Sequence, residues 1–190
     1  MYKFDDLSLE QLNALEKFVD SDKITFLLSF LNSNYSARQI DVIGRAVLDG
    51  VDVSDLLNPL FSAESLSVLI EAKKLGIDVS DLLNVHISYK SLMVLCEAKM
   101  KGINVKGLDN NHVDINLLKQ IINVKISEPN KDLSFIRDLS ADDCRQLVED
   151  YKMVANYGID CNFQKYKEKV DLDRKKIITE FNFARSKQGK

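Results

Sequence analysis

The chain has 190 residues, of which 45% are hydrophobic and 29% are charged, and this composition excludes a disordered protein. Only seven glycines and two prolines are present, with no tryptophan, which favours helices joined by short turns over a loop-rich β-sandwich. We therefore expect an all-α fold, in a chain long enough to bury a core without disulfides or metals.

The N-terminal segment predicts a soluble chain. It is polar, without the apolar core of a signal peptide. The longest apolar run, Ile24 to Leu31, is too short to span a bilayer.

Three widely spaced cysteines (Cys96, Cys144 and Cys161) form no C-x-x-C motif and are typical of reduced thiols. We expect a cytoplasmic protein that does not enter membranes.

Residues 1–34 are expected to form an N-terminal helical cap that contains one degenerate repeat. The first helix begins after Ser8, and an apolar helix over 21–31 follows it. This second helix could cover the end of the core or pair two chains, so a homodimer is one alternative.

Residues 35–163 are expected to be tandem helical repeats of 26 residues. Segments that begin at Tyr35, Phe61, Ile87, Val113 and Leu139 align at this spacing. Their second residue is Ser or Asp, the preferred helix N-caps, and apolar residues before and four positions after the cap form a hydrophobic staple. The expected caps, with the one in the N-terminal copy, are Ser8, Ser36, Ser62, Ser88, Asp114 and Ser140.

Each early repeat is expected to end its helix at a glycine, because glycine readily adopts the left-handed conformation of a helix stop. These glycines are Gly50, Gly76 and Gly102. The segments 51–58 and 77–84 then predict a turn and a short second helix, capped by aspartates at 52, 55, 78 and 81. In the copy that begins at Val113, a loop over 127–132 replaces the glycine stop. The helix of the copy that begins at Leu139 is expected to end near Tyr157.

Such a unit cannot bury its apolar face alone, so neighbouring units must stack. In the copies that begin at Phe61 and Ile87, the apolar positions include Leu75 and Met100, which we expect to face the core. Glu97 is expected to pair with Lys101, four residues later on the same helix. The predicted architecture is a short right-handed or curved solenoid with atypical helical caps at both ends, forming a single compact domain.

Residues 164–190 are expected to form a basic amphipathic C-terminal helix. They hold nine Lys and Arg against four Asp and Glu, a charge of +5, whereas the remainder has 17 against 25, a charge of −8. Apolar residues at 166, 170, 177, 178 and 181 fall on one face of this helix. The opposite, basic face either binds phosphates or an acidic protein or balances the charge of the body.

The segment from Gly50 to Leu66, GVDVSDLLNPLFSAESL, resembles short helical repeats in many uncharacterised Firmicutes proteins, whose pattern is G-[VL]-D-V-S-x-Y-x-[DN]-P-x-F-[SD]-x-x-Q-M. The resemblance covers about residues 35–163; Leu56-Leu57 and Leu66 depart from the pattern's aromatic residue and methionine. Many such proteins are encoded by phages, plasmids and conjugative elements. The resemblance implies a helical-repeat fold in a mobile-element context and no catalytic residue. An ankyrin assignment is rejected because T-P-L-H is absent.

No residue pattern predicts catalysis, a cofactor or a metal. His86 and His112 share one repeat position without further metal ligands beside them, and Cys96 and Cys144 occupy core positions without an adjacent base. We expect a non-enzymatic protein-binding module, and the resemblance implies one that binds and blocks or modulates a host protein complex such as a defence system. Outward residues that differ between copies are the expected binding residues: Arg45, Glu71, Lys90, Glu97 and Lys101.

The alternative is association with nucleic acid or nucleoprotein through the basic C-terminal helix. A partner bound there would contact its cationic side chains: Lys165, Lys167, Lys169, Arg174, Lys175, Lys176, Arg185 and Lys187.

Overall fold

The structure is a computed structural model that describes residues 6–30, 32, 34–157 and 162–188, without the side chains of 154–157 and 181–188. These residues form eight α-helices and short 3₁₀ turns but no strand, so the all-α expectation is confirmed. The chain forms two compact units, unit 1 (Met1–Lys101) and unit 2 (Gly102–Lys190). The predicted domain boundaries at residues 34 and 163 stay predictions.

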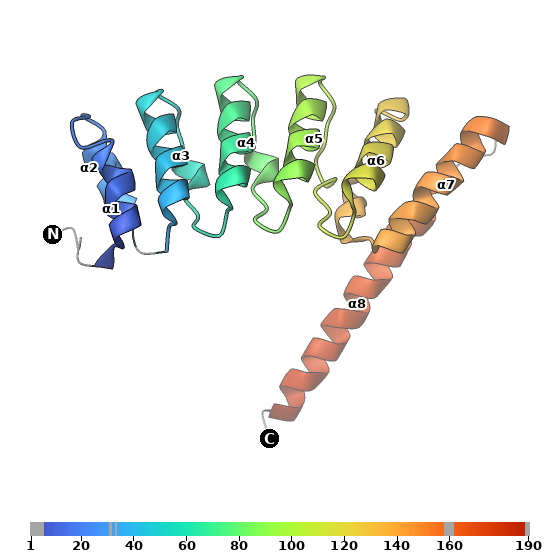
Figure 1. Cartoon of the computed structure of the whole chain (residues 1–190). Helices are drawn as coiled ribbons and strands as arrows, with labels where there is room; N and C mark the ends of the chain where they lie inside the picture. The colour runs from blue at the N-terminus through green and yellow to red at the C-terminus, as the bar shows by residue number, and fades with distance from the viewer. Residues whose placement is uncertain (1–5, 31, 33, 158–161, 189–190) are drawn as a thin grey trace. The chain divides into compact units, whose positions relative to one another are not determined.

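Unit 1 is a series of helices that pack in chain order. Helix α3 packs against both α1 and α4, and α4 packs against α5, so that neighbouring helices lie side by side (Figure 1). Short 3₁₀ turns, η2 and η3, connect the longer helices. The elements are α1 (Leu9–Glu16), α2 (Ile24–Phe30), α3 (Ala37–Leu48), η2 (Ser54–Leu56), α4 (Ala63–Lys74), η3 (Ser80–Leu82) and α5 (Tyr89–Met100).

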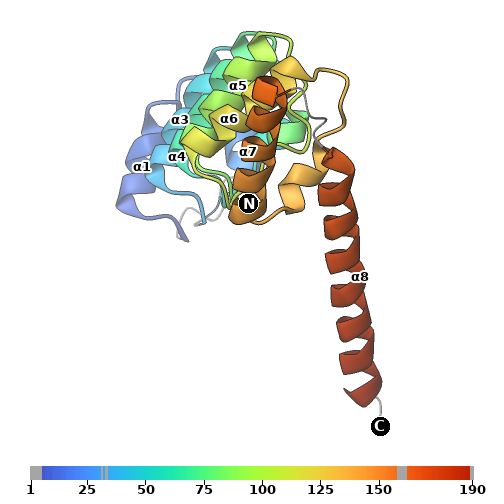
Figure 2. The same ribbon diagram turned by 90° about the vertical axis from the view of Figure 1, so that its right-hand side faces the viewer.

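Unit 2 contains α6 (Ile115–Ser127), η4 (Ser134–Asp138), α7 (Ala141–Tyr157) and α8 (Phe163–Gln188). Helix α6 packs against α7, and α8 contacts both α7 and η4. The C-terminal part of α8 extends away from α6 and α7 (Figure 2). Its residues 171–180 are all exposed, so this part of α8 buries no side chain against the rest of unit 2.

The expected cap residues begin the helices. The hydroxyl of Ser36 accepts a hydrogen bond from the Gln39 backbone amide at 3.2 Å, and the Ser36 backbone amide donates one to Gln39 Oε1, which makes a capping box. Ser8 forms the same box with Gln11. Single-sided caps begin α4, α5, α6 and α7, at Ser62, Ser88, Asp114 and Ser140.

Glycine follows the ends of α3, α4 and α5. Gly50 and Gly76 have φ of +77° and +75°, a region that costs other residues about 1–2 kcal/mol. The Val51 amide donates to Ala46 O at 2.9 Å, and the Gly50 amide donates to Val47 O at 3.1 Å. These two bonds are the Schellman motif, which satisfies carbonyls that the helix end leaves free. Gly102 also has a positive φ, +76°.

The core of unit 1 lies between the long helices and the 3₁₀ turns. Leu66 and Leu69 on α4 are fully buried, as is Leu56 of η2. Leu27 of α2 is also fully buried, so this helix covers part of the core. Burial of a large aliphatic side chain stabilises a fold by about 1.5–3 kcal/mol, and this burial requires the neighbouring helix.

Asparagines at one repeat position hold the connections between helices, a role that we did not expect from the sequence. Asn58 Oδ1 accepts a hydrogen bond from the Leu60 amide at 3.0 Å, and Asn84 accepts one from His86 in the same way. Asn110 is buried; its amide group also donates to the carbonyls of Ile136 and Leu139, at 2.6 and 2.8 Å. The 26-residue spacing of asparagines was the available signal.

The predicted short second helices are single 3₁₀ turns. Asp52 Oδ1 accepts from the Ser54 amide at 3.0 Å, so this aspartate caps its turn as expected. Asp55 does not: its carboxylate instead forms an ion pair with Lys73 of α4, at 2.5 Å. Lys99 and Asp81 make the equivalent pair one repeat later. Asp55 cannot cap η2, because it lies inside this turn, past the position at which a side chain can cap it.

Candidate functional site

The first candidate surface is the basic face of α8, and acidic residues of unit 2 neutralise part of it. Lys165 pairs with Asp150 and Lys169 pairs with Asp143, each at 2.5 Å. Arg174 forms an ion pair with Asp138 of η4. Of the six predicted cations whose side chains the structure describes, three therefore have acidic partners within unit 2.

These ion pairs accompany apolar docking of the first half of α8. Tyr166 and Val170 are buried, and the Tyr166 hydroxyl donates to Asp150 at 2.7 Å. The hydrogen bond from Lys169 lowers the pKa of Asp143, and Asp143 in turn raises the pKa of Lys169. This half of the helix is thus held to α7 by both burial and charge.

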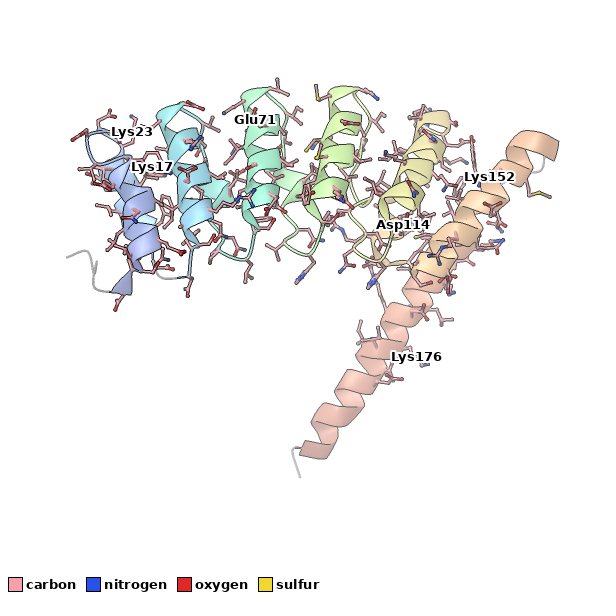
Figure 3. The ribbon with its side chains drawn as sticks, viewed as in Figure 1. Lys17, Lys23, Glu71, Asp114, Lys152 and Lys176 are labelled. Atoms are coloured by element: carbon pink, nitrogen blue, oxygen red, sulfur yellow. The ribbon has the colours of Figure 1, made fainter. Side chains whose placement is uncertain are left out.

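The other cations of α8 are exposed where the structure describes them. Lys167, Lys175 and Lys176 form no ion pair among the described side chains. Figure 3 shows Lys176 on the part of α8 that extends beyond α7. The side chains of Arg185 and Lys187 lie outside the described residues. The positive face available to a ligand is therefore smaller than the sequence suggests.

The second candidate surface is formed by the outward residues of the unit 1 helices. Arg45 pairs with Asp41 of its own helix at 3.0 Å, and Glu71 pairs with Lys74 at 2.9 Å. The remaining three predicted residues, Lys90, Glu97 and Lys101, are exposed. The expected ion pair between Glu97 and Lys101 is wrong, since no contact within 4 Å joins these described side chains.

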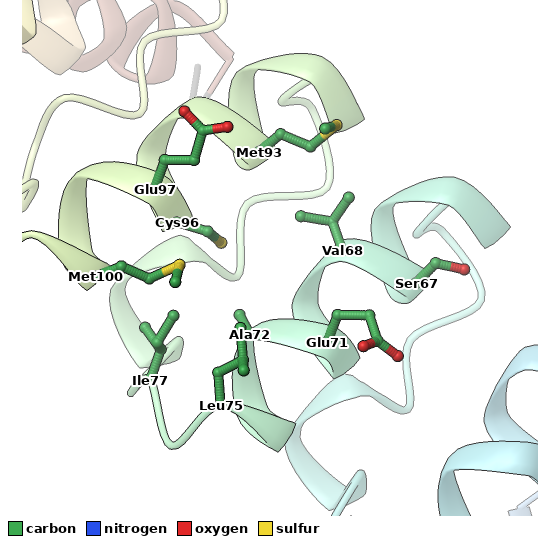
Figure 4. Close-up of a pocket in the computed structure, with 10 residues that line it drawn as sticks. All are labelled: Ser67, Val68, Glu71, Ala72, Leu75, Ile77, Met93, Cys96, Glu97 and Met100. Carbon is green, nitrogen blue, oxygen red and sulfur yellow. The ribbon is translucent and has the colours of Figure 1, made fainter.

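An apolar groove opens on this surface between α4 and α5 (Figure 4). It encloses about 320 Å³. Helix α5 contributes Met93 and Met100, and α4 contributes Val68 and the C-capping Leu75. Ile77, Ala72 and Cys96 complete the apolar part of the lining. Ser67 is its neutral polar residue, and Glu71 and Glu97 are its charged residues.

Three of the lining side chains are large, apolar and exposed. The exposed fraction is 65% for Leu75, 59% for Met100 and 46% for Met93. Exposed apolar side chains are ordinary when scattered, but a contiguous group beside a groove marks an interaction site more often. Here the three residues converge on one opening (Figure 4).

The expectation that Leu75 and Met100 face the core is wrong. Leu75 follows Leu66 by nine residues, which is two and a half helical turns, so the two side chains project on opposite sides of α4. Met100 is the last residue of α5 and follows Cys96, which lies at the edge of the buried face. For Leu75 the helical period already argues against a place in the core. Met100 lies only about 40° from Cys96 around α5, so the period does not exclude the core, and its exposure is shown by the structure.

The preceding pair of helices has a different surface at the equivalent positions. One repeat earlier, Met93, Met100 and Leu75 correspond to Ser67, Lys74 and Asp49. Lys74 Nζ lies 2.9 Å from Asp49 Oδ2, so an ion pair joins α4 to the end of α3 where the later groove is open. The repeat pattern therefore does not require apolar residues at these places, and the α3–α4 pair differs here from the α4–α5 pair.

The described cysteines are unsuited to nucleophilic catalysis. Burial raises the pKa of Cys96, and burial raises the pKa of Cys144 to about 12. A thiol needs the thiolate form to react, which these environments disfavour. Cys161 lies outside the described residues.

The histidines occupy exposed turn positions, where their backbone amides donate to Asn84 and Asn110. They lie in different units, so their predicted proximity stays a prediction. Within the described ranges, no three His, Cys, Asp or Glu side chains gather where they could hold a metal ion.

None of the described helices combines the length and apolar character needed to cross a membrane. Comparisons of the chain with protein-family models, curated proteins and solved structures found no match. The surfaces described above are therefore the features of the protein that point to a function.

Proposed function

We propose that the protein is a non-enzymatic protein-binding module. The observation that carries the proposal is the α4–α5 groove, where Leu75, Met93 and Met100 are exposed around one apolar opening. Water solvates these side chains poorly, and each apolar Å² that a partner covers contributes roughly 25 cal/mol. A protein surface is the partner that supplies matching apolar side chains together with polar groups at the rim.

The repeat pattern supports this proposal because the residues that stabilise the fold differ from the exposed residues that could contact a partner. Caps, staples and asparagines recur at fixed positions, while exposed residues at one position change from Arg45 to Glu71 and Glu97. In our proposal the units stack into a short solenoid with atypical helical caps at the ends, so that the variable residues form one extended surface. Its curvature and handedness follow from the stacking.

In the cell, we propose that the protein acts in the cytoplasm, is encoded by a phage or other mobile element, and binds and blocks or modulates a host protein complex such as a defence system. The resemblance of Gly50 to Leu66 to repeats of Firmicutes mobile-element proteins supports this context. The acidic charge of −8 outside the C-terminal segment would favour a basic host surface.

Affinity capture tests the binding function. Tagged full-length protein is incubated with lysate from a Firmicutes bacterium, with and without nuclease, and a helical protein of equal size and charge serves as the bait control. We expect a defined host protein to be captured at a stable ratio whether or not nuclease is present. Failure to retain any protein above the control, across several such lysates, would contradict the proposal.

A second candidate function, nucleic-acid association, is favoured by the unpaired cations of α8. Lys167, Lys175 and Lys176 are exposed without ion pairs among the described side chains. Replacement of all three by glutamine tests it better than deletion, because deletion would also remove the buried Tyr166 and Val170. We expect the affinity of wild type for nucleic acid to fall steeply with salt, and the affinity of the variant to depend less on salt. Absence of binding by wild type would exclude this function, and a variant that binds as wild type does would exclude the α8 cations as the binding site.

A further inference from the structure

The partner of the α4–α5 groove can be specified further from the charges around it. This inference rests on the proposed protein-binding function. Every charged side chain that lines the groove is acidic, namely Glu71 on α4 and Glu97 on α5, and no lysine or arginine lines it. Glu97 has no ion pair among the described side chains, and Glu71 shares its carboxylate with the ammonium group of Lys74.

The charge of unit 1 has the same sign as the groove. Its residues 1–101 carry 15 Asp and Glu against 10 Lys and Arg, a net charge of −5. A ligand that approaches unit 1 with positive charge is steered toward it, whereas an acidic ligand is repelled. Both the local carboxylates and the wider field therefore select for a basic partner.

The apolar lining sets the remaining requirement. Met93 and Val68 lie at one end of the groove, and Met100 with Leu75 and Ile77 lies at the other, so the apolar strip follows the helices (Figure 4). Methionine side chains adapt to different partner shapes because they are unbranched and polarisable. An amphipathic helix fits such a strip with apolar residues spaced at i, i+3, i+4 and i+7.

We propose that the α4–α5 groove binds an amphipathic helix of a partner protein, whose apolar stripe covers Leu75, Met93 and Met100 and whose flanking lysines or arginines pair with Glu71 and Glu97. The α3–α4 pair cannot bind in this way, because Lys74 and Asp49 form an ion pair where the groove would open. One repeat of unit 1 thus carries the recognition site, and the preceding repeat is its natural negative control.

A synthetic helix of about 18 residues, long enough to hold helical structure, is the probe. It carries a leucine stripe flanked by lysines; a second peptide has glutamate in place of every lysine. Full-length protein is labelled at the methionine methyl groups, and chemical shifts are followed during titration. The lysine peptide is expected to shift the methyl signals of Met93 and Met100 and leave that of Met153 on α7 unchanged.

Two variants separate the apolar from the charged contribution. Leu75→Asp with Met100→Lys installs the ion pair that α3 and α4 already tolerate, so folding is preserved, and affinity is expected to fall at least about tenfold, or 1.4 kcal/mol. Glu71→Gln with Glu97→Gln is expected to remove the preference for the lysine peptide over the glutamate peptide. Leu60→Ser changes an equally exposed leucine outside the groove and is expected to leave affinity unchanged.

The proposal is overturned if the lysine peptide leaves Met93 and Met100 unshifted, if both peptides bind equally, or if the Leu75→Asp, Met100→Lys variant binds like wild type. Methyl shifts that depend on protein concentration without peptide would identify a second copy as the occupant and also overturn it. A host protein that is captured equally by wild type and this variant would reject the groove while the wider binding function stands.

Discussion

Lys99 on α5 and Asp81 in η3 form an ion pair that repeats, 26 residues later, the contact between Lys73 and Asp55. Both side chains of the Lys99 pair are partly shielded, with 16% and 25% of their surface exposed. In each of these two repeats, the ion pair joins the 3₁₀ turn to the helix that follows it. This connection within the unit adds to the apolar core between neighbouring helices.

A double-mutant cycle on Lys99→Met and Asp81→Asn is expected to give a coupling energy of about 1 kcal/mol, at the upper end of the range for exposed pairs, because both groups are shielded. Urea unfolding measures it. The matched control is Arg145 with Asp142 on α7, an exposed pair whose coupling should stay below about 0.3 kcal/mol. Equal coupling in the two cycles would show that shielding is irrelevant here.

Glycine replacements should separate conformational strain from steric overlap. Gly76→Ala is expected to reduce the free energy of unfolding by about 1 kcal/mol, because φ is +75° while a Cβ atom meets nothing within 4 Å. Gly107→Ala should cost at least about twice as much, because φ is +79° and the added Cβ would lie 2.4 Å from Ser134 Cα. Urea unfolding at one pH compares the two; the reverse order would contradict the fold around Gly107.

Asn110→Ala is expected to destabilise the protein by about 2–4 kcal/mol. The change removes hydrogen bonds to the His112 amide and to the carbonyls of Ile136 and Leu139, and leaves buried groups without partners. Asn58→Ala, which loses the bond from the Leu60 amide, should cost about 1 kcal/mol. Thermal and urea unfolding provide the comparison, and similar losses for both variants would argue against the Asn110 contacts.

The ion pair of Asp143 and Lys169 should make stability depend on pH at both extremes. The folded-state pKa of Asp143 is lowered, so its stabilisation is present above the unfolded pKa near 4 and is lost as pH falls through the folded value. The pKa of Lys169 is raised, so its contribution is present below about 10.4 and is lost as pH rises further.

Asp143→Asn tests this pH dependence, because it removes the carboxylate that shifts Lys169. The free energy of unfolding, measured from acidic to alkaline pH, should fall less steeply at both ends in the variant than in wild type. Lys152→Gln is the control, since Lys152 pairs with Glu149 within one exposed turn of α7. A variant curve parallel to that of wild type would contradict the assigned interaction.

Local chemistry made much of this fold predictable from sequence. The cap at Ser36, the stop at Gly50 and the helix between them follow from hydrogen bonds over a few residues. The ion pair of Lys73 with Asp55 spans 18 residues, and no short-range rule relates those two positions. The tight approach of Gly107 to Ser134 likewise depends on how two connections meet in space.

The binding groove could be predicted only in part. Glu71 and Glu97 were recognisable because they are polar and differ from Arg45 at the same repeat position. Leu75 and Met100 were assigned to the core because an apolar residue near a helix end has two environments that look the same in the sequence. Two properties decide between the core and the surface: the direction in which the side chain projects from its helix, and how far the neighbouring helix extends alongside it. The second property is seen only in the structure.

The repeat pattern also allows the protein to lose one complete 26-residue unit while the remaining units keep their contacts. Removal of residues 63–88 would join Ser62 to Tyr89, so the cap of α4 would become the cap of α5. Asp55 would then stand 18 positions before Lys99, the spacing it now has to Lys73, and Gln39 would keep its bonds to the carbonyls of Pro59 and Phe61. Recombination between copies could thus shorten the protein without unfolding it, while the loss of Leu75 would erase the groove.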